Sequence, residues 1–254
     1  MKYAQLIFSP TGGTLKIADI ITQEWNTDVE TIDLTNAADD FSKYAFQKED
    51  VVLIAVPSYG GRIPAATAER ILHIQGNQAD CILVCVYGNR AYEDTLVEMA
   101  DIAKQCGFKI VAAVSAVAEH SIMRQYATGR PDAQDTKQLK AYGKTILVKL
   151  GNPSQDTELQ LPGNRPYKKA GGAGLVPKAN KDCVNCSLCA EQCPVSAINR
   201  KTPNITDAKK CISCMRCVKI CPHSARKVNS VMVSAASLAL KKACSVRKEC
   251  ELFI

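Results

Sequence analysis

The 254-residue sequence contains no apolar run close to the roughly 18 residues that a membrane-spanning helix needs. Its longest candidate, VMVSAASLAL, is too short and is followed by lysines. Features of a signal peptide are also missing, because the first apolar stretch is brief and no small-residue cleavage site follows it. No low-complexity tract argues for disorder, and the 46% of hydrophobic residues is enough for a core. These absences predict a cytoplasmic protein without a membrane span.

Cysteine, by contrast, is abundant: the chain has thirteen. A disulfide framework is not expected in a reducing compartment, so these thiols need another explanation. Eight of them fall in two short segments, CVNCSLCAEQCP from Cys183 and CISCMRCVKICP from Cys211, which repeat the same spacing 28 positions apart. The other five are expected to be buried small hydrophobes or free thiols.

Each repeat reads C-x2-C-x2-C-x3-C-P, a spacing that suits [4Fe-4S] clusters. The first three thiolates of a repeat bind one cluster, and the fourth, before proline, binds the other. Cluster one would use Cys183, Cys186, Cys189 and Cys221, and cluster two would use Cys211, Cys214, Cys217 and Cys193. The alternatives are zinc, which usually takes C-x2-C pairs a dozen or more residues apart, and free or bridged thiols. The doubled pattern resembles bacterial-type two-cluster ferredoxins.

The charge is divided unevenly along the chain. Residues 1–150 hold 15 Lys and Arg against 18 Asp and Glu, whereas residues 151–254 hold 17 against 7. A basic half usually suggests nucleic acid. Two oxidised clusters with their thiolates would carry about −2 each and so cancel part of this excess. We therefore expect no nucleic-acid binding.

The first 150 residues alternate apolar strand patterns with helical ones. The expected strands cover 2–8, 29–34, 51–57, 81–87 and 109–117, and the expected helices cover 14–25, 64–75, 91–106 and 132–150. Nearly continuous β-branched runs are typical of buried parallel strands, so the pattern predicts a doubly wound α/β sheet. Ligands of such sheets bind beyond the carboxyl ends of the strands.

The remaining chain divides into three parts. Residues 151–177 are dense in glycine and proline and predict a linker or wrapping arm. The cysteine repeats define a small domain over about 178–228. The tail, 229–254, has partly helical spacing and is expected to pack back on one of the domains.

The first strand runs into a glycine turn, SPTGGT, directly before a helix. Such a turn points backbone N–H groups at one spot, and the helix N-terminus adds positive potential. No lysine follows, so the loop is not that of a nucleoside triphosphatase. It resembles the phosphate loop of flavodoxins, which implies that Ser9, Pro10, Thr11, Gly12, Gly13 and Thr14 hold the phosphate of FMN. The alternative is a plain tight β–α connection.

Two further loops leave the ends of central strands beside this turn, PSYGGRIP and YGNRAYED. In flavodoxin-like domains these positions hold the isoalloxazine ring. The residues implied are Pro57, Ser58, Tyr59, Gly60, Gly61, Gly88, Asn89, Arg90, Tyr92 and Asp94. Either Tyr59 or Tyr92 is a candidate for stacking on the ring, with ordinary loop packing as the alternative. His120, in the long loop after the fifth strand, is a candidate proton donor, or a histidine bonded within its loop.

Taken together, the two halves resemble the flavodoxin–ferredoxin fusion proteins of anaerobic bacteria and archaea. The resemblance implies a flavodoxin-like five-stranded parallel sheet in the order 2-1-3-4-5, followed by a small α+β ferredoxin domain. It also implies FMN, two [4Fe-4S] clusters and a redox protein partner. The only tryptophan, Trp25, lies on the first helix, too early to stack on a flavin.

Three functions remain open at this point. The first is an electron relay between FMN, the clusters and a partner protein. The second is an FMN-dependent reductase of a small molecule or quinone, fed by the clusters. The third is a module that has lost its flavin and acts as a scaffold. Whether the chain is an enzyme, and its oligomeric state, stay undetermined.

Overall fold

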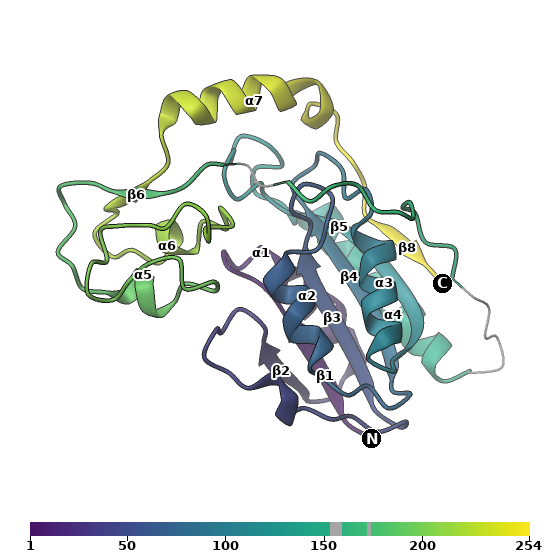
Figure 1. The fold of residues 1–254 in the computed structure, drawn as a ribbon. Helices are drawn as coiled ribbons and strands as arrows, with labels where there is room; N and C mark the ends of the chain where they lie inside the picture. Colours follow the sequence, from purple (N-terminus) through teal and green to yellow (C-terminus); the bar gives the residue numbers. More distant parts are fainter. Residues whose placement is uncertain (153–158, 172–173) are drawn as a thin grey trace.

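A computed structural model describes residues 1–152, 159–171 and 174–254. Its main element is a sheet whose first five strands are parallel in the order β2-β1-β3-β4-β5 (Figure 1). These strands are β1 (Tyr3–Ile7), β2 (Val29–Asp33), β3 (Val51–Pro57), β4 (Asp80–Tyr87) and β5 (Lys109–Val117). The sheet confirms the flavodoxin-like order 2-1-3-4-5 expected from the sequence.

Helices cover both faces of this sheet. The helices are α1 (Gly13–Thr22), α2 (Ala65–Leu72), α3 (Thr95–Gln105) and α4 (Ala133–Leu150). Side chains alternate along each strand, so Val52 and Ile54 join one core cluster while Val51 and Leu53 join the other. Because both clusters are buried, the central strands β3, β4 and β5 have nearly continuous apolar sequences.

The C-terminal tail is partly helical and packs back on the larger domain. It begins as α7 (Ser230–Cys244), whose last residue, Cys244, is its buried one, while Val231 and Leu238 stay exposed. The chain then adds a sixth strand, β8 (Glu251–Phe253), which pairs antiparallel with β5. Figure 1 shows α7 spanning from the small lobe to the sheet. The tail therefore packs back as an edge strand, with the helix as a bridge.

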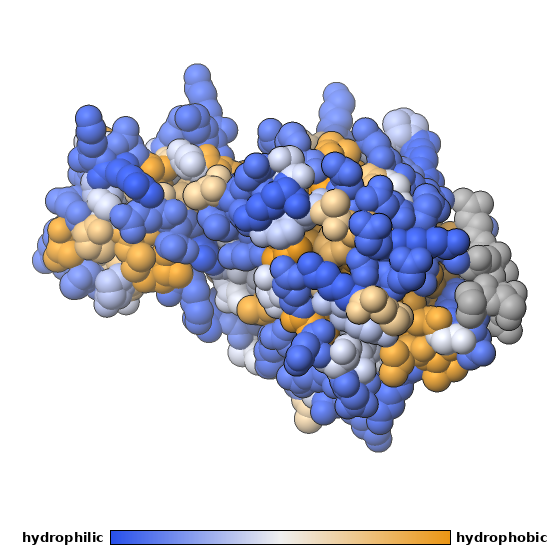
Figure 2. Space-filling view, turned by 90° about the horizontal axis from the view of Figure 1, so that it is seen from below, coloured by the Kyte–Doolittle hydropathy of each residue, from blue (hydrophilic) through white to orange (hydrophobic). Residues whose placement is uncertain are grey.

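The cysteine-rich region forms the small lobe at the left of Figures 1 and 2. It contains β6 (Lys178–Ala179) antiparallel to β7 (Arg226–Lys227), and the short helices α5 (Leu188–Glu191) and α6 (Arg216–Lys219). The helices begin 28 residues apart. Left-handed residues recur at the same interval, in the pairs Asn185 and Ser213, Ser187 and Met215, and Ser196 and Ser224. The sequence repeat is therefore also a repeat of the backbone.

The segment expected as a linker, 151–177, lies partly outside the described residues, at 153–158 and 172–173. Its described part follows the larger domain as an arm. Arg165 pairs with Asp101 at 2.6 Å, and the backbone N–H of Asn164 donates to Asp94 at 2.9 Å. Among the described residues, no helix is both long and apolar enough to cross a membrane.

Candidate redox sites

A cavity of about 420 Å³ opens where β1, β3, β4 and β5 end. Its walls include most of the loop residues singled out from the sequence. These are Pro10, Thr11, Gly13, Thr14, Pro57, Ser58, Tyr59, Gly60, Gly88, Arg90 and His120. The three loops therefore converge on one site, as the carboxyl edge of a parallel sheet predicts.

The glycine turn offers backbone donors to this cavity. Gly12 adopts φ 95°, a left-handed conformation that suits glycine, and no side chain caps α1 there. The Ser9 hydroxyl accepts the N–H of Leu15 at 3.0 Å, and the Gly12 carbonyl accepts the N–H of Lys16 at 3.0 Å. The N–H groups of Gly13 and Thr14, in the first turn of the helix, have no intrahelical acceptor. They fit an anionic group bound in the cavity.

Some of the predicted residues stabilise the loops and do not line the cavity. Ser9 and Gly12 shape the turn, as described above. Gly61 packs against Glu93, so closely that an added Cβ would lie 1.8 Å from its carboxylate. Tyr92 donates its hydroxyl to Glu251 at 2.7 Å, which makes Tyr59 the tyrosine of the two that lines the cavity.

Asn89 and Asp94 also point away from the cavity and bind other parts of the chain. The Asn89 amide donates to the carbonyls of Cys244 and Val246 at 2.8 and 2.9 Å. Asp94 accepts the backbone N–H of Lys168 at 2.7 Å, and that of Asn164 in the arm, and these bonds lower its pKa. Both residues therefore hold the later segments against the loop 88–94.

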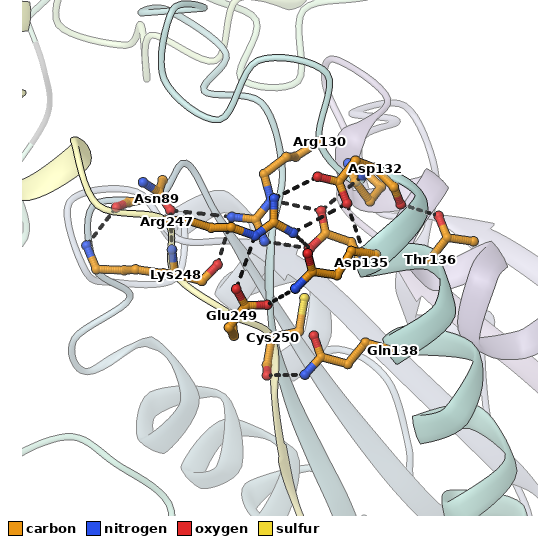
Figure 3. A network of polar contacts seen from close by, with 12 residues as sticks. Asn89, Arg130, Asp132, Asp135, Thr136, Gln138, Arg247, Lys248, Glu249 and Cys250 are labelled. Carbon is orange, nitrogen blue, oxygen red and sulfur yellow. Dashed lines mark hydrogen bonds and ion pairs between the residues drawn. The ribbon is translucent and has the colours of Figure 1, made fainter.

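A network of buried charges fixes the same loop and its neighbour (Figure 3). Arg130 and Asp135 form an ion pair at 2.5 Å with side chains 5% and 0% exposed. Arg247, from the tail, reaches Asp135 at 3.0 Å and Asp132 at 2.7 Å, and its hydrogen bond holds the pKa of Asp132 well below the usual range. Lys248 donates to the carbonyls of loop 88–94. The tail is thus built into the rim of the cavity.

Three segments that the sequence did not suggest also line the cavity. They are the arm through Lys168, Lys169 and Gly171, the cysteine-rich lobe through Ile212 and Ser213, and α7 through Leu240. A basic pair in a glycine-rich arm carries no periodic signal, and the helical spacing of the tail does not say on which domain it packs. Only tertiary docking brings them to the site.

His120 lines the cavity, and its Nδ1 is engaged within its own loop. Its Nδ1 accepts the backbone N–H groups of Ile122 and Met123, both at 3.2 Å. Burial, and then the positive charge of Arg90, lower its pKa below the ordinary value. A neutral ring whose Nδ1 accepts carries its proton on Nε2. His120 therefore presents a hydrogen-bond donor, and a neutral imidazole is a weak acid.

The eight cysteines of the repeats gather into the two quartets that the spacing predicts. Cys183, Cys186, Cys189 and Cys221 surround one small hollow, and Cys193, Cys211, Cys214 and Cys217 surround another. The fourth cysteine of each repeat makes the same hydrogen bond. The Cys193 sulfur accepts the N–H of Ala197 and the Cys221 sulfur accepts that of Ala225, each at 3.3 Å.

The quartets fit a cluster better than a single metal ion. Among the residues that the structure describes, no three His, Cys, Asp or Glu side chains lie close enough to share one ion. A zinc ion would draw its four sulfurs to about 2.3 Å from one centre. A cube of four irons and four sulfides holds its thiolates farther apart, around its corners. The arrangement thus argues against the zinc alternative.

Residues 182–226 match the family described as a 4Fe-4S dicluster domain. The match includes all eight cysteines of the two quartets, since it begins at Asp182 and ends at Arg226. No curated protein matches the chain.

Among solved structures, the chain is similar to flavodoxins over its larger domain. A flavodoxin of Streptococcus pneumoniae TIGR4 is 18% identical, with a TM-score of 0.42, over 58% of this chain and 99% of that one. A flavodoxin from the domain Archaea is 14% identical, with a TM-score of 0.43, over 60% and 100%. A variant flavodoxin of Fusobacterium nucleatum bound to flavin mononucleotide is 19% identical, with a TM-score of 0.40, over 59% and 96%. The fold itself follows from the strand order.

The cysteine-rich lobe, which matches the dicluster family, contacts the cavity with its second quartet. Ile212 and Ser213, which line the cavity, stand between Cys211 and Cys214 in the chain. Burial raises the pKa of Tyr59 well above its usual range, and the nearby Cys214 adds to this. The second quartet therefore lies next to the cavity wall.

Two arginines bind the domains together at this seam. Arg70 of α2 donates to the carbonyl of Pro194, and Arg216 of α6 donates to the carbonyl of Pro10 at 3.5 Å. The second contact joins the helix after Cys214 to the glycine turn itself.

Gly88 offers a direct test of the cavity. An added Cβ would lie 2.7 Å from Cδ2 of His120. Overpacking of this kind costs about 1–3 kcal/mol, so if the cavity holds FMN, Gly88→Ala will weaken FMN binding by roughly 5- to 150-fold. Flavin fluorescence titration of the deflavinated protein measures this.

Gly151→Ala is the matched control, because its Cβ would meet only ordinary contacts at the end of α4. Equal FMN affinity in both variants would show that the cavity is not the flavin site.

Proposed function

We propose that this chain is an electron-transfer protein that holds FMN in the cavity and two [4Fe-4S] clusters in the cysteine quartets, and that it relays electrons to a redox partner. The single observation that carries the proposal is the position of the second quartet against the cavity, through Ile212 and Ser213. FMN exchanges one or two electrons and each cluster exchanges one.

Different residues of the chain would contact the phosphate and the ring of FMN. Gly13 and Thr14 give backbone N–H groups to its phosphate, without a lysine. Tyr59 and Gly88 stand on opposite loops where the flat ring would lie, and His120 gives it an Nε2–H donor. Lys168 and Lys169, from the arm, bring positive charge to the same cavity. Positive charge and hydrogen-bond donors favour a ring that gains electrons.

For the clusters, Cys183, Cys186, Cys189 and Cys221 would hold the first, and Cys211, Cys214, Cys217 and Cys193 the second. The backbone N–H groups of Ala197 and Ala225 then stabilise the thiolates. Arg226 is buried in the same lobe, at 2% exposed, and adds a positive charge beside the first quartet. Such charge favours the reduced, more negative cluster.

The size and covering of the cavity support the relay over a small-molecule reductase. Its volume, about 420 Å³, is at the lower end of the range of about 300–1,000 Å³ for ligand sites. The arm, α7 and the dicluster domain all cover it, so one flavin leaves little room for a second substrate. Burial lowers the pKa of His120 and so favours the neutral ring, which is a weak proton donor.

The test is purification without oxygen, followed by assays of iron, sulfide and flavin. We expect about eight irons and one FMN per chain. Stepwise reduction should then bleach the flavin and the clusters in overlapping phases. A folded protein that contains zinc at the cysteines, or that takes up no flavin, would overturn the proposal.

A further inference from the structure

We propose that the surface over the first quartet is the docking site for an acidic one-electron redox protein. This inference rests on the proposed function, and it names the exit for the electrons and the kind of partner. The two quartets differ in exposure: Cys186 is exposed, whereas Cys214 is buried. The other six cysteines are half-buried, so the first quartet is the more exposed of the two.

The flavin cavity itself is a poor exit. Lys168 and Gly171 of the arm, Ser213 of the dicluster domain and Leu240 of α7 close it on several sides. A protein partner that approached there would meet these segments first. Electrons that enter the second quartet can instead leave through the first. The two quartets are interlocked, because each repeat contributes its fourth cysteine, Cys193 or Cys221, to the quartet of the other repeat.

The chemistry of the surface indicates an acidic partner. Exposed basic residues follow or flank the first quartet: Lys178, Lys181, Arg200, Lys201 and Lys227. The carbonyl of Arg200 accepts the hydroxyl of Ser187, which lines the hollow of that quartet. Lys178 and Lys227 are register partners on β6 and β7. Asp182 and Glu191 are the acidic residues nearest to the quartet in the chain.

These basic side chains are not engaged elsewhere. Within residues 1–152, 159–171 and 174–254, none of the five forms an ion pair, whereas Arg62, Arg90 and Lys168 around the flavin cavity all pair with Glu98 or Glu93. Three of the positive charges around the cavity are therefore paired within the chain, whereas Lys169, which also lines it, forms no ion pair among the described residues. Over the first quartet the positive charge is left for a partner.

The excess of positive charge in this lobe is larger than the negative charge that two clusters would add. Residues 178–228 hold ten Lys and Arg against three Asp and Glu, an excess of seven. Two oxidised clusters with their thiolates would remove about four of these charges and leave about three. A surface of this sign attracts an acidic protein and raises its association rate.

Two exposed apolar residues supply a centre for the interface. Val184 is 59% exposed and lines the hollow of the first quartet, and Ile205 is 60% exposed, two residues after Pro203 of the same hollow. In Figure 2, apolar residues interrupt the hydrophilic surface of the small lobe. A small apolar centre with a charged rim is the usual anatomy of a transient interface.

The test compares two triple variants of the holoprotein. Lys181→Glu, Arg200→Glu and Lys201→Glu together reverse the rim. Lys48→Glu, Lys137→Glu and Lys241→Glu reverse three exposed lysines on the other parts of the chain and serve as the matched control. The probe is a purified acidic [2Fe-2S] ferredoxin of the plant type, with a basic c-type cytochrome as the opposite probe. The readouts are complex formation by titration and the bimolecular rate by stopped flow, both against ionic strength.

We expect the rim variant to react roughly 10- to 1,000-fold more slowly with the acidic ferredoxin at low salt, and to bind it less tightly. The control should stay close to the parent, and the difference should shrink as salt rises. The basic cytochrome should gain rate from the rim variant. Equal loss in both triple variants, or no dependence on salt, would overturn the docking site.

This outcome is separable from failure of the proposed function. If cofactor content and internal reduction of the clusters by the flavin are normal in the parent and both variants, only the docking site is in question. If the parent lacks internal transfer, the proposed function fails instead. Binding of duplex DNA that the rim variant loses, with no effect on the ferredoxin, would assign the basic rim to nucleic acid and overturn the inference.

Discussion

Loss of the second cluster is expected to isolate the flavin from the first. In Cys214→Ala with Cys217→Ala, iron should fall from about eight to about four atoms per chain, because one quartet loses two of its ligands. Since Ile212 and Ser213 place that quartet at the cavity, the remaining cluster has no neighbouring centre through which to exchange electrons. Reduction of the first cluster by the flavin should become too slow to detect within one chain.

Cys183→Ala with Cys186→Ala is the matched control for this experiment. It removes the same number of ligands from the first quartet, and iron should again fall to about four atoms. Here the flavin should still reduce the second cluster at the parental rate, while transfer to a partner protein is lost. Cluster absorbance and paramagnetic resonance report which centre remains, and near-normal internal transfer in the first variant would contradict the order flavin, second cluster, first cluster.

Removal of Arg130 is expected to destabilise the larger domain strongly. Asp135 is fully buried, and Arg130→Met takes away its closest partner, the guanidinium at 2.5 Å. Breaking a buried ion pair costs about 3–5 kcal/mol because it leaves an uncompensated charge. Arg247, at 3.0 Å from Asp135, offsets part of this, so we expect about 3 kcal/mol and a fall in Tm of roughly 6–12 °C.

Arg124→Met is the control for the buried pair. Arg124 pairs with Glu119 at 2.6 Å, but its side chain is 77% exposed, so its loss should cost only about 0–1 kcal/mol. Thermal unfolding followed by circular dichroism, at one scan rate and with equal cofactor content, compares the two. Equal Tm values would mean that the network in Figure 3 does not hold the loops of the cavity rim.

The sequence predicts those features that depend on local pattern. Nearly continuous apolar runs, such as Val51–Pro57, indicate buried strands, and the resemblance then supplies the order that the structure confirms. The cysteine spacing predicts both quartets by residue, because ligands of one cluster are close in sequence or related by the repeat. Trp25, expected to lie away from the flavin, packs on Tyr3 with ring centroids 5.7 Å apart.

Features that depend on docking were beyond the sequence. The strand β8 has only three residues, and nothing in the sequence indicates that Ser115 and Tyr92 donate hydrogen bonds to its Glu251. Asn89 and Asp94 lie in a loop that resembles a flavin loop, but their side chains bind the tail and the arm. No local pattern distinguishes a loop residue that touches a ligand from one that holds the next segment in place.

The most direct test of the account is the rate of electron transfer from flavin to cluster within one chain. A light pulse with a deazaflavin photosensitiser reduces the bound flavin, and absorbance then follows its reoxidation as a cluster bleaches. If the second cluster lies beside the cavity, the rate constant will not change when the protein is diluted tenfold. A rate that falls in proportion to the protein concentration would show that electrons pass only between molecules, and it would contradict the arrangement on which the relay depends.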